Sequence, residues 1–240
     1  KAGNATSVIR FLPNKEITDI PFVRLYTHSF KDPNTNRWYI ENSLSTIGEQ
    51  DYIATMNSEL WNTGIEENKE IARSRKRKLN FISNILVIKD SANPENEGKV
   101  FLFRYGQKIF NKIVAAAKPD EDLGEQPINV IDPNEGADFS LRQTVVANFP
   151  NYDGSKFGSK KPIAKTQKEI DAVLAQCFDI NEEVTPAKFK SQEDLKKKFL
   201  WVTGAEDSKN REKEYDKELD ELTKIAASTE KVTKPVVSKS

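Results

Sequence analysis

The sequence LNFISNILVIK, residues 79–89, is the strongest strand signal in the chain. It consists mostly of the β-branched, aliphatic and aromatic residues that favour an extended backbone. Residues 93–98 (NPENEG) follow as a turn, and residues 99–105 (KVFLFRY) have the composition of a second strand. The two runs together predict a β-hairpin, around which the other segments are interpreted.

Upstream of this hairpin the sequence predicts two more strands and a second hairpin. Residues 7–12 (SVIRFL) and 22–30 (FVRLYTHSF) are rich in Val, Ile, Phe and Tyr. A turn cluster at 32–36 is followed by a short strand at 37–41, so that 22–41 is expected to form a hairpin.

The helical signals are weaker. Residues 48–62 carry apolar groups close to helical spacing, and residues 106–117 also favour a helix. Two helices are predicted at 166–178 and 191–203, the second with Ser at its start and acidic residues in its first turn. Residues 66–78 are mostly polar and basic, and their pattern fits either a helix or a flexible arm.

The short strands with long connections indicate the fold class. Residues 127–131 and 138–149 supply two more expected strands, and 148–161 is expected to be a long loop. Five or more such strands fit a mixed β fold, an OB-fold-like five-stranded partly open barrel elaborated by helices and an extra small subdomain. We expect this core to span residues 1–204, with residues 205–240 forming a charged helical or disordered tail.

Charge is balanced overall but segregated along the chain. The 240 residues contain 37 Lys and Arg and 37 Asp and Glu, which excludes a uniformly basic protein. Residues 69–112 hold eleven cationic and four acidic side chains, whereas residues 113–139 hold one and seven. A local basic surface is therefore predicted, which an anionic partner would recognise.

The sequence lacks the residues that are typical of several classes of function. No apolar run approaches the roughly 18 residues of a membrane span. There is no Gly-rich phosphate loop, and His28 and Cys177, each the only residue of its type, lie far apart. Cys177 allows no internal disulfide, and a structural role is expected for His28. The chain is therefore predicted not to be an enzyme, with a metal-dependent nuclease using the acidic cluster at 120–138 as the remaining enzymatic alternative.

The basic run RSRKRK at residues 73–78 has aromatic residues on both sides. By itself it also fits a solvated charge run or a localisation signal. Cations interleaved with rings are what single-stranded nucleic acid requires, because cations neutralise phosphates and aromatic faces stack on bases without reading sequence. The loop at 148–157 supplies a second set of aromatic and basic residues.

The predicted site residues form two sets. The predicted DNA-binding cations are Arg73, Arg75, Lys76, Arg77, Lys78, Arg104, Lys108 and Lys156. The predicted base-stacking residues are Trp61, Phe81, Phe103, Tyr105, Phe149 and Tyr152. No catalytic or metal-binding residue and no cofactor is predicted.

The chain resembles the core domain of the single-stranded-DNA-binding proteins of T-even-like bacteriophages. The blocks that carry the resemblance run in order from residue 2 to residue 204. They are Ala2-Gly3-Asn4 with VIRFLP (8–13), WYIE (38–41), KRK (76–78), NILVIKD (84–90), PENEGKVF (94–101), NYD (151–153) and KFKS (188–191).

This resemblance implies an OB-fold core that coats single-stranded DNA in phage replication, recombination and repair, and that destabilises the double helix. Its partners would be single-stranded DNA and the replication and recombination proteins of the phage, in the cytoplasm of the bacterial host, with no membrane. The positions that fall on the family's cleft are Trp61, Phe81, Phe103, Phe149, Tyr152, Lys76, Arg77, Lys78 and Arg104. Ile71 and Ile82 stand where the family has aromatic residues, so fewer bases would be stacked.

The resemblance departs from the family at its structural zinc. His28 fits the family's histidine ligand, but Ser43 stands in place of the first cysteine, and residues 50–56 lack the cysteine pair. One histidine without nearby cysteines cannot form a tetrahedral site, so a zinc-free variant is predicted. The subdomain at about 28–62 would then be filled by an apolar cluster of Tyr52, Ile53, Met56 and Leu60.

Two other family segments bear on self-association. The family has a basic N-terminal arm, and this sequence begins after it; the acidic C-terminal tail is represented only by its beginning, in 206–240. We therefore expect self-association along DNA only in the full-length protein. The alternatives to the strand-binding function are an OB-like adaptor that binds a protein partner through the basic run and, less favoured, a nucleic-acid enzyme.

Overall fold

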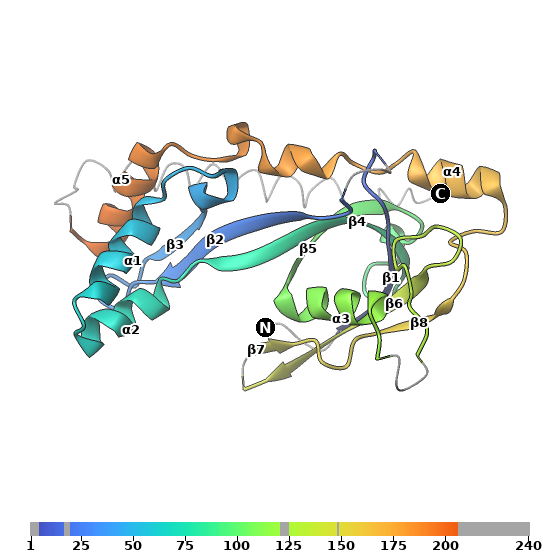
Figure 1. Cartoon of the computed structure of the whole chain (residues 1–240), viewed down its shortest axis with the longest axis horizontal. Helices are drawn as coiled ribbons and strands as arrows, with labels where there is room; N and C mark the ends of the chain where they lie inside the picture. Colours follow the sequence, from blue (N-terminus) through green and yellow to red (C-terminus); the bar gives the residue numbers. More distant parts are fainter. Residues whose placement is uncertain (1–4, 17–19, 121–124, 148, 206–240) are drawn as a thin grey trace, which may run out of the picture.

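The run LNFISNILVIK lies within strand β4 (Lys78–Asp90), which takes part in both ends of the molecule (Figure 1). The first residues of this strand pair with β2 (Val23–Lys31). Its last residues pair with β1 (Ala5–Phe11), and much of its length pairs with β5 (Val100–Gly106) on the other edge. One long strand therefore connects two lobes.

The structure is a computed structural model that describes residues 5–16, 20–120, 125–147 and 149–205. Within these residues eight strands form one antiparallel sheet, ordered β3-β2-β4-β1-β6-β7, with β5 on β4 and β8 on β6. The remaining strands are β3 (Trp38–Asn42), β6 (Ala137–Val146), β7 (Phe149–Asn151) and β8 (Lys156–Lys160). The helices are α1 (Tyr52–Asn62), α2 (Glu66–Ser74), α3 (Gln107–Ala117), α4 (Gln167–Leu174) and α5 (Gln192–Thr203). Short 3-10 helices are η1 (Leu44–Ile47), η2 (Pro94–Asn96), η4 (Ile180–Val184) and η5 (Pro186–Lys188).

The barrel lobe is a curled antiparallel half-barrel with α3 packed against it (Figure 1). Strand pleating sends alternate β4 side chains, among them Phe81, Ile85 and Val87, into its core. Removing a Phe or Ile side chain of this kind from water contributes about 1.5–3 kcal/mol. The core residues are Ile9, Phe11, Phe81, Ile85, Val87, Tyr105, Ile109, Val130 and Phe139.

The helical lobe is built on the far ends of β2 and β3 by α1, α2 and α5 (Figure 1). Its core stacks Phe30 on Tyr39, with ring centroids 5.2 Å apart, and places Phe199 of α5 edge-on to both. The cluster is Phe30, Tyr39, Leu44, Ile53, Leu195, Phe199 and Val202. Helix α5 therefore completes a core that was predicted to lie within residues 28–62.

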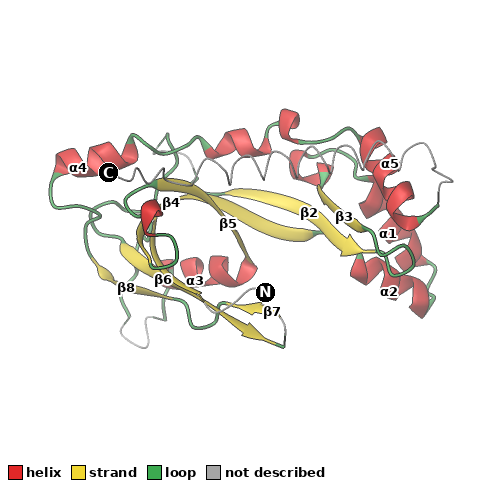
Figure 2. Ribbon diagram, turned by 180° about the vertical axis from the view of Figure 1, so that it is seen from behind, coloured by secondary structure: helices red, strands yellow, loops and turns green. Residues whose placement is uncertain are grey.

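The opposite face of β4 is covered by the chain that leads from α4 to α5 (Figure 2). Asn84, a polar residue inside an apolar strand, is fully buried and holds this chain in place. Its amide nitrogen donates to the carbonyl oxygens of Phe178 (2.9 Å) and Pro13 (3.1 Å), and its Oδ1 accepts from the Phe178 amide (3.0 Å). Both hydrogen-bonding ends of the buried amide are thus used, which a buried polar group requires.

The two predicted hairpins are confirmed, since β2 pairs with β3 and β4 pairs with β5. The ambiguous segment at 66–78 forms α2 and then a short connection to β4. Two predictions were wrong. Residues 127–131 form no strand, and the expected loop at 148–161 contains β7 and β8, which fold back along β6.

The loop that follows residues 127–131 wraps around a buried arginine. The Arg10 guanidinium donates to the carbonyl oxygens of Asp132 (2.8 Å) and Lys161 (2.9 Å) and pairs with the Asp138 carboxylate (3.3 Å). The Asp132 carboxylate accepts from the amides of Asn134 and Glu135, which turns the chain sharply. The Asp132 and Lys161 carbonyls thus bind Arg10, while within 127–131 the Ile128 amide donates to the Ala116 carbonyl of α3 (2.8 Å) instead of to a neighbouring strand.

The mixed sheet with helices agrees with the predicted class in its coarse form. The half-barrel is joined to a longer sheet that runs into the helical lobe, so the described strands number eight rather than five. The predicted tail at 205–240 lies, except for residue 205, outside the described residues. No helix in the described residues is both long and apolar enough to cross a membrane.

Gly136→Ala is expected to destabilise the barrel lobe. A Cβ at this position would lie 2.5 Å from the Asp132 carbonyl oxygen and 2.7 Å from Nη2 of Arg10, so the loop or the buried arginine must move. Overpacking of this kind costs about 1–3 kcal/mol. Urea unfolding at pH 7 measures the loss, and Gly106→Ala, whose Cβ would meet nothing within 4 Å, is the control. Equal midpoints for the two variants would contradict this account of Arg10.

Candidate nucleic-acid interface

One face of the sheet between the lobes presents cations next to rings. The register of β2 with β4 places Arg24 opposite Phe81 and Tyr26 opposite Leu79, and paired residues share a face. Arg24 is exposed and Tyr26 is partly exposed. The Arg77 guanidinium lies 4.7 Å from the centre of the Tyr26 ring, in cation–π geometry. We call Arg24, Tyr26, Arg77 and Leu79 the basic-aromatic face.

Helix α3 covers the adjoining part of the same side of the sheet. Phe110 of α3 stacks on Phe81 with ring centroids 3.9 Å apart and planes 1° from parallel. Phe22, just before β2, packs edge-on against Phe110, with ring centroids 5.0 Å apart. The basic-aromatic face therefore begins where α3 stops covering the sheet, and partly buried rings form its border.

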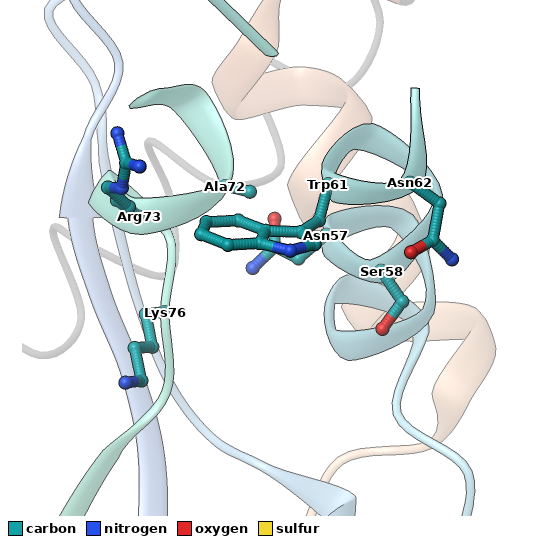
Figure 3. A pocket seen from close by; sticks show the side chains of 7 residues that line it. All are labelled: Asn57, Ser58, Trp61, Asn62, Ala72, Arg73 and Lys76. Atoms are coloured by element: carbon teal, nitrogen blue, oxygen red, sulfur yellow. The ribbon is translucent and has the colours of Figure 1, made fainter. Parts of the chain in front are cut away.

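A pocket of about 610 Å³ lies between α1 and α2, beyond the Arg77 end of the face (Figure 3). Trp61 projects from α1 across this space, with 47% of its surface exposed. The Arg73 guanidinium lies 5.2 Å from the centre of the indole ring. The residues that line the pocket are Asn57, Ser58, Trp61, Asn62, Ala72, Arg73 and Lys76.

The turn between β7 and β8 is attached to α3 by charge. Lys108 pairs with the Asp153 carboxylate at 3.3 Å, and the Lys112 ammonium donates to the Asp153 carbonyl at 2.9 Å. This contact places the turn on the side of the sheet that α3 covers, which is also the side of Arg77. In Figure 1, β7 and α2 both lie along the lower edge of the molecule.

The aromatic residues predicted to stack on bases have different surroundings. Trp61 is half-exposed, and Phe149, beside β6 on β7, is 74% exposed. Phe103 and Tyr152 are partly buried against the barrel core, and the Tyr152 hydroxyl donates to Gln143 at 3.1 Å. Two exposed rings and two partly buried rings are therefore available on the surface.

Phe81 and Tyr105 are corrections to the predicted stacking set. They are 1% and 4% exposed and belong to the barrel core, so neither can offer a ring face to a base. Tyr105 shares a hydrogen bond with Ser83, and burial raises the pKa of its phenol to about 12. Sequence alternation identified a shared strand face but not that this face points inward.

The predicted cations also separate into groups. Arg73 pairs with Glu66 and Glu70 on its own helix, and Arg75 pairs with Asp32 at 3.7 Å while covering the Phe30 and Phe199 rings. By contrast, Lys76 and Arg77 pair with no acidic side chain among the described residues. These two cations therefore remain available for an anionic partner.

Three predicted cations lie away from the basic-aromatic face. Lys78 is opposite Thr27, and Arg104 donates to the Thr27 hydroxyl at 3.3 Å, on the other side of the sheet. Burial lowers the pKa of Arg104. Lys156 points away from the barrel core, into which its neighbour Phe157 packs. The structure does not bring these side chains together with Arg77.

Arg24 and Tyr26 were absent from the predicted site although the sequence contains a signal for them. In FVRLYTHSF, residues 22–30, the alternate positions Phe22, Arg24 and Tyr26 form a ring-cation-ring series on one strand face. The intervening Val23 and Leu25 are buried on the other face. A cation in the exposed half of an alternating strand is the feature that would have identified them.

The position predicted to lack zinc holds a buried hydrogen-bond network. His28 places Nε2 3.1 Å from Oδ1 of Asp51, and its Nδ1 donates to the Arg75 carbonyl at 2.9 Å. The other Asp51 oxygen accepts from the Ser43 hydroxyl (2.7 Å) and the Leu44 amide (3.1 Å). The network thus connects β2, the N-terminus of α1 and the residue that precedes the free cations Lys76 and Arg77.

The Asp51 carboxylate is the centre of this network. Burial by itself would raise the pKa of Asp51, but hydrogen bonds from His28, Ser43 and the Ala54 amide outweigh it and hold the pKa well below its usual range. Asp51 also caps α1 by accepting the Ala54 amide at 2.9 Å. In the described residues no three His, Cys, Asp or Glu side chains are grouped as metal ligands would be.

The apolar cluster expected from Tyr52, Ile53, Met56 and Leu60 is only partly present in the helical lobe. Ile53 is buried in the helical-lobe core and Tyr52 packs against it, beside Phe199 of α5. Met56 and Leu60 are partly exposed and are not part of that core. The α5 residues Leu195, Phe199 and Val202 belong to that core instead.

Comparison with known proteins identifies relatives along nearly the whole described chain. Residues 3–203 match the family model described as gp32 DNA binding protein like. The single-stranded DNA-binding protein of Enterobacteria phage T2 is 44% identical over 211 residues, covering 85% of this chain and 67% of that protein. The protein of the same name from Enterobacteria phage T4 is 43% identical over the same length and shares. That of Escherichia phage SV14 is 44% identical over 75 residues, which is 29% of this chain and 60% of that protein.

Asp51→Asn is expected to lower the free energy of unfolding by about 3 kcal/mol at pH 7, because it removes the charged acceptor of a buried network. The pKa of Asp51 is depressed in the folded state, so its contribution is present above the ordinary value of 3.8 and is lost as pH falls below it. The difference between the variant and the unsubstituted protein should therefore shrink in acid. Urea unfolding across this pH range measures it.

Asp194→Asn, at an exposed carboxylate in the first turn of α5, is the control and should change stability by less than about 0.5 kcal/mol. A destabilisation of Asp51→Asn that stays constant from pH 7 down to pH values of roughly 2 would contradict the assigned role.

Proposed function

The chain belongs to the family of gp32-like DNA-binding proteins, and on this premise we propose that it binds single-stranded DNA through the basic-aromatic face and the Trp61 pocket. The observation that carries the proposal is that Arg24, Lys76 and Arg77 lack acidic partners among the described residues. Arg77 lies over the Tyr26 ring, Lys76 lines the Trp61 pocket, and Arg24 is on the same strand face as Tyr26. Cations already neutralised by carboxylates gain little from a phosphate, whereas these three retain their full attraction.

The strand would bind by two separate contributions. Phosphates release counterions when they meet the free cations, which gives affinity that falls with salt. Unpaired bases stack on rings such as Tyr26, Trp61 and Phe149, at about 1–3 kcal/mol per base and with little dependence on sequence. The stacked Phe81 and Phe110 rings border the face on the side of the barrel lobe.

We further propose that the half-barrel is an OB-like core and that the protein is not an enzyme. It would coat the strand in phage replication, recombination and repair, in the cytoplasm of the bacterial host. Selective binding of unpaired strands displaces the duplex equilibrium by mass action, which is how such a protein destabilises a helix. Contacts with replication and recombination proteins, and self-association along DNA in the full-length protein, complete this proposal.

Arg77→Ala is expected to weaken binding to an oligothymidylate and to reduce the slope of log K against log salt by about 0.7, the share of one phosphate on a single strand. Fluorescence titrations at several salt concentrations measure both quantities. Lys89→Ala, at the opposite and exposed end of β4, is the matched control and should leave the slope unchanged. Equal slopes for both variants would remove Arg77 from the interface.

Quenching of tryptophan fluorescence by the oligonucleotide should come from Trp61. The Trp61→Phe variant is expected to lose most of the quenching while retaining a ring for stacking. Trp38 is also exposed, but it lies on the edge strand β3, away from the basic-aromatic face, and Trp38→Phe should quench like the unsubstituted protein. If the quenching were lost in Trp38→Phe instead, the bound oligonucleotide would lie away from the basic-aromatic face, which would contradict the proposal.

A further inference from the structure

The turn between β7 and β8 places one acidic residue against two cations of α3. Lys108 and Lys112 are four residues apart, so they lie on one face of that helix. The Lys108 ammonium is 3.3 Å from Oδ1 of Asp153, and the Lys112 ammonium donates to the Asp153 carbonyl oxygen at 2.9 Å. A single residue of the turn therefore holds both cations.

Asn151 fixes the orientation of the Asp153 carboxylate. The Asn151 amide nitrogen donates to Oδ2 of Asp153 at 2.7 Å, and its Oδ1 accepts from the Asp153 backbone amide at 2.8 Å. The hydrogen bonds from Asn151 and Lys108 lower the pKa of Asp153, so this carboxyl group is charged at neutral pH. A full negative charge is thus directed at α3.

The ion pair is not needed to form the turn. The Ser155 amide donates to the Tyr152 carbonyl (3.0 Å), and the Ser155 hydroxyl accepts from the Arg142 amide of β6 (2.9 Å). β7 and β8 each pair with β6, and α3 packs against the barrel core. Because the turn and the helix are held independently, the pair between Lys108 and Asp153 can open without loss of the fold.

The ion pair is also open to exchange with another anion. The side chains of Lys108 and Asp153 are 62% and 68% exposed. Exposed pairs of this kind are weak and are screened by salt, so a phosphate that approaches Lys108 can compete with the carboxylate. An ammonium that turns to the phosphate leaves Asp153 without this partner.

Asp153 lies beside the proposed path of the strand. The turn follows β7, which carries the exposed Phe149, and α3 borders the basic-aromatic face through Phe110 (Figure 1). A strand that runs from the basic-aromatic face to Phe149 therefore passes α3. The cations that it meets there are Lys108 and Lys112.

We propose that Asp153 is a competing anion that limits the affinity for single-stranded DNA, because it occupies Lys108 until a phosphate of the strand displaces it. This inference rests on the proposed function and deepens it, since it concerns the regulation of the same site. The free cations Lys76 and Arg77 bind phosphate directly, whereas Lys108 binds it only in exchange for Asp153.

Asp153→Asn keeps the shape of the side chain and removes its charge. This variant is expected to bind an oligothymidylate of about twelve nucleotides about fivefold more tightly at low salt, because Lys108 becomes a free cation. The slope of log K against log salt should become steeper by about 0.7, the share of one further phosphate on a single strand. Fluorescence titrations at several salt concentrations measure both quantities, and the urea midpoint should stay unchanged.

The same substitution made together with Lys108→Ala separates exchange from general repulsion. In that background the gain from Asp153→Asn should fall below about twofold, since no cation at position 108 is released to the strand. Asp171→Asn is the matched control for the change in net charge. It alters an exposed carboxylate on α4, which packs on the opposite face of β4, and should leave affinity and slope unchanged.

The outcomes separate the two proposals. An Asp153→Asn variant that binds no more tightly than the unsubstituted protein would overturn the competing role of Asp153 and leave strand binding intact. A gain of equal size with and without Lys108 would also overturn it. Failure of the unsubstituted protein to bind the oligonucleotide at low salt would instead overturn the proposed function.

Discussion

The structure depends on one strand that is covered on both faces. β4 pairs with β2 at its start and with β1 at its end, so a continuous ladder holds the barrel lobe and the helical lobe in a fixed relation. Phe81, Ile85 and Val87 anchor one face in the barrel, while Asn84 ties the other to the chain that leads to α5. Lys76 and Arg77 immediately precede this strand, so their backbone is held in place by it.

The basic-aromatic face follows from that arrangement. Arg77 directly precedes β4, and it stacks on a tyrosine of the strand that β4 pairs with. The carbonyl of Arg75, two residues earlier, is held by His28, and that histidine contacts Asp51 at the start of α1. A network of neutral and charged hydrogen bonds therefore fixes the approach to the face from the helical lobe, and the Phe81–Phe110 stack supports it from the barrel lobe.

The local sequence pattern predicted the helices and strands better than it predicted which of their faces are buried. Both hairpins and the later helices were evident from residue type and spacing, because their signals lie within a few consecutive residues. The sequence could not show that Phe81 and Tyr105 point into a core. Their burial depends on α3 packing onto these strands, which is a tertiary contact that the pattern of neighbouring residues does not reveal. It also could not show that Asp32, distant in sequence, neutralises Arg75, or that the carbonyl of Asp132, just after 127–131, accepts from the buried Arg10. Arg24, by contrast, was missed although its alternation with Phe22 and Tyr26 was visible in the sequence.

The most direct test of the central claim is to locate the strand on the surface. Oligonucleotides carrying 5-iodouracil can be photocrosslinked to the protein, and the modified residues identified by mass spectrometry. The account predicts adducts at Tyr26, Trp61 and Phe149, on the side of the sheet that carries Arg24 and Arg77. Adducts confined to Trp38 and Phe178, exposed residues that lie away from the basic-aromatic face, would contradict it.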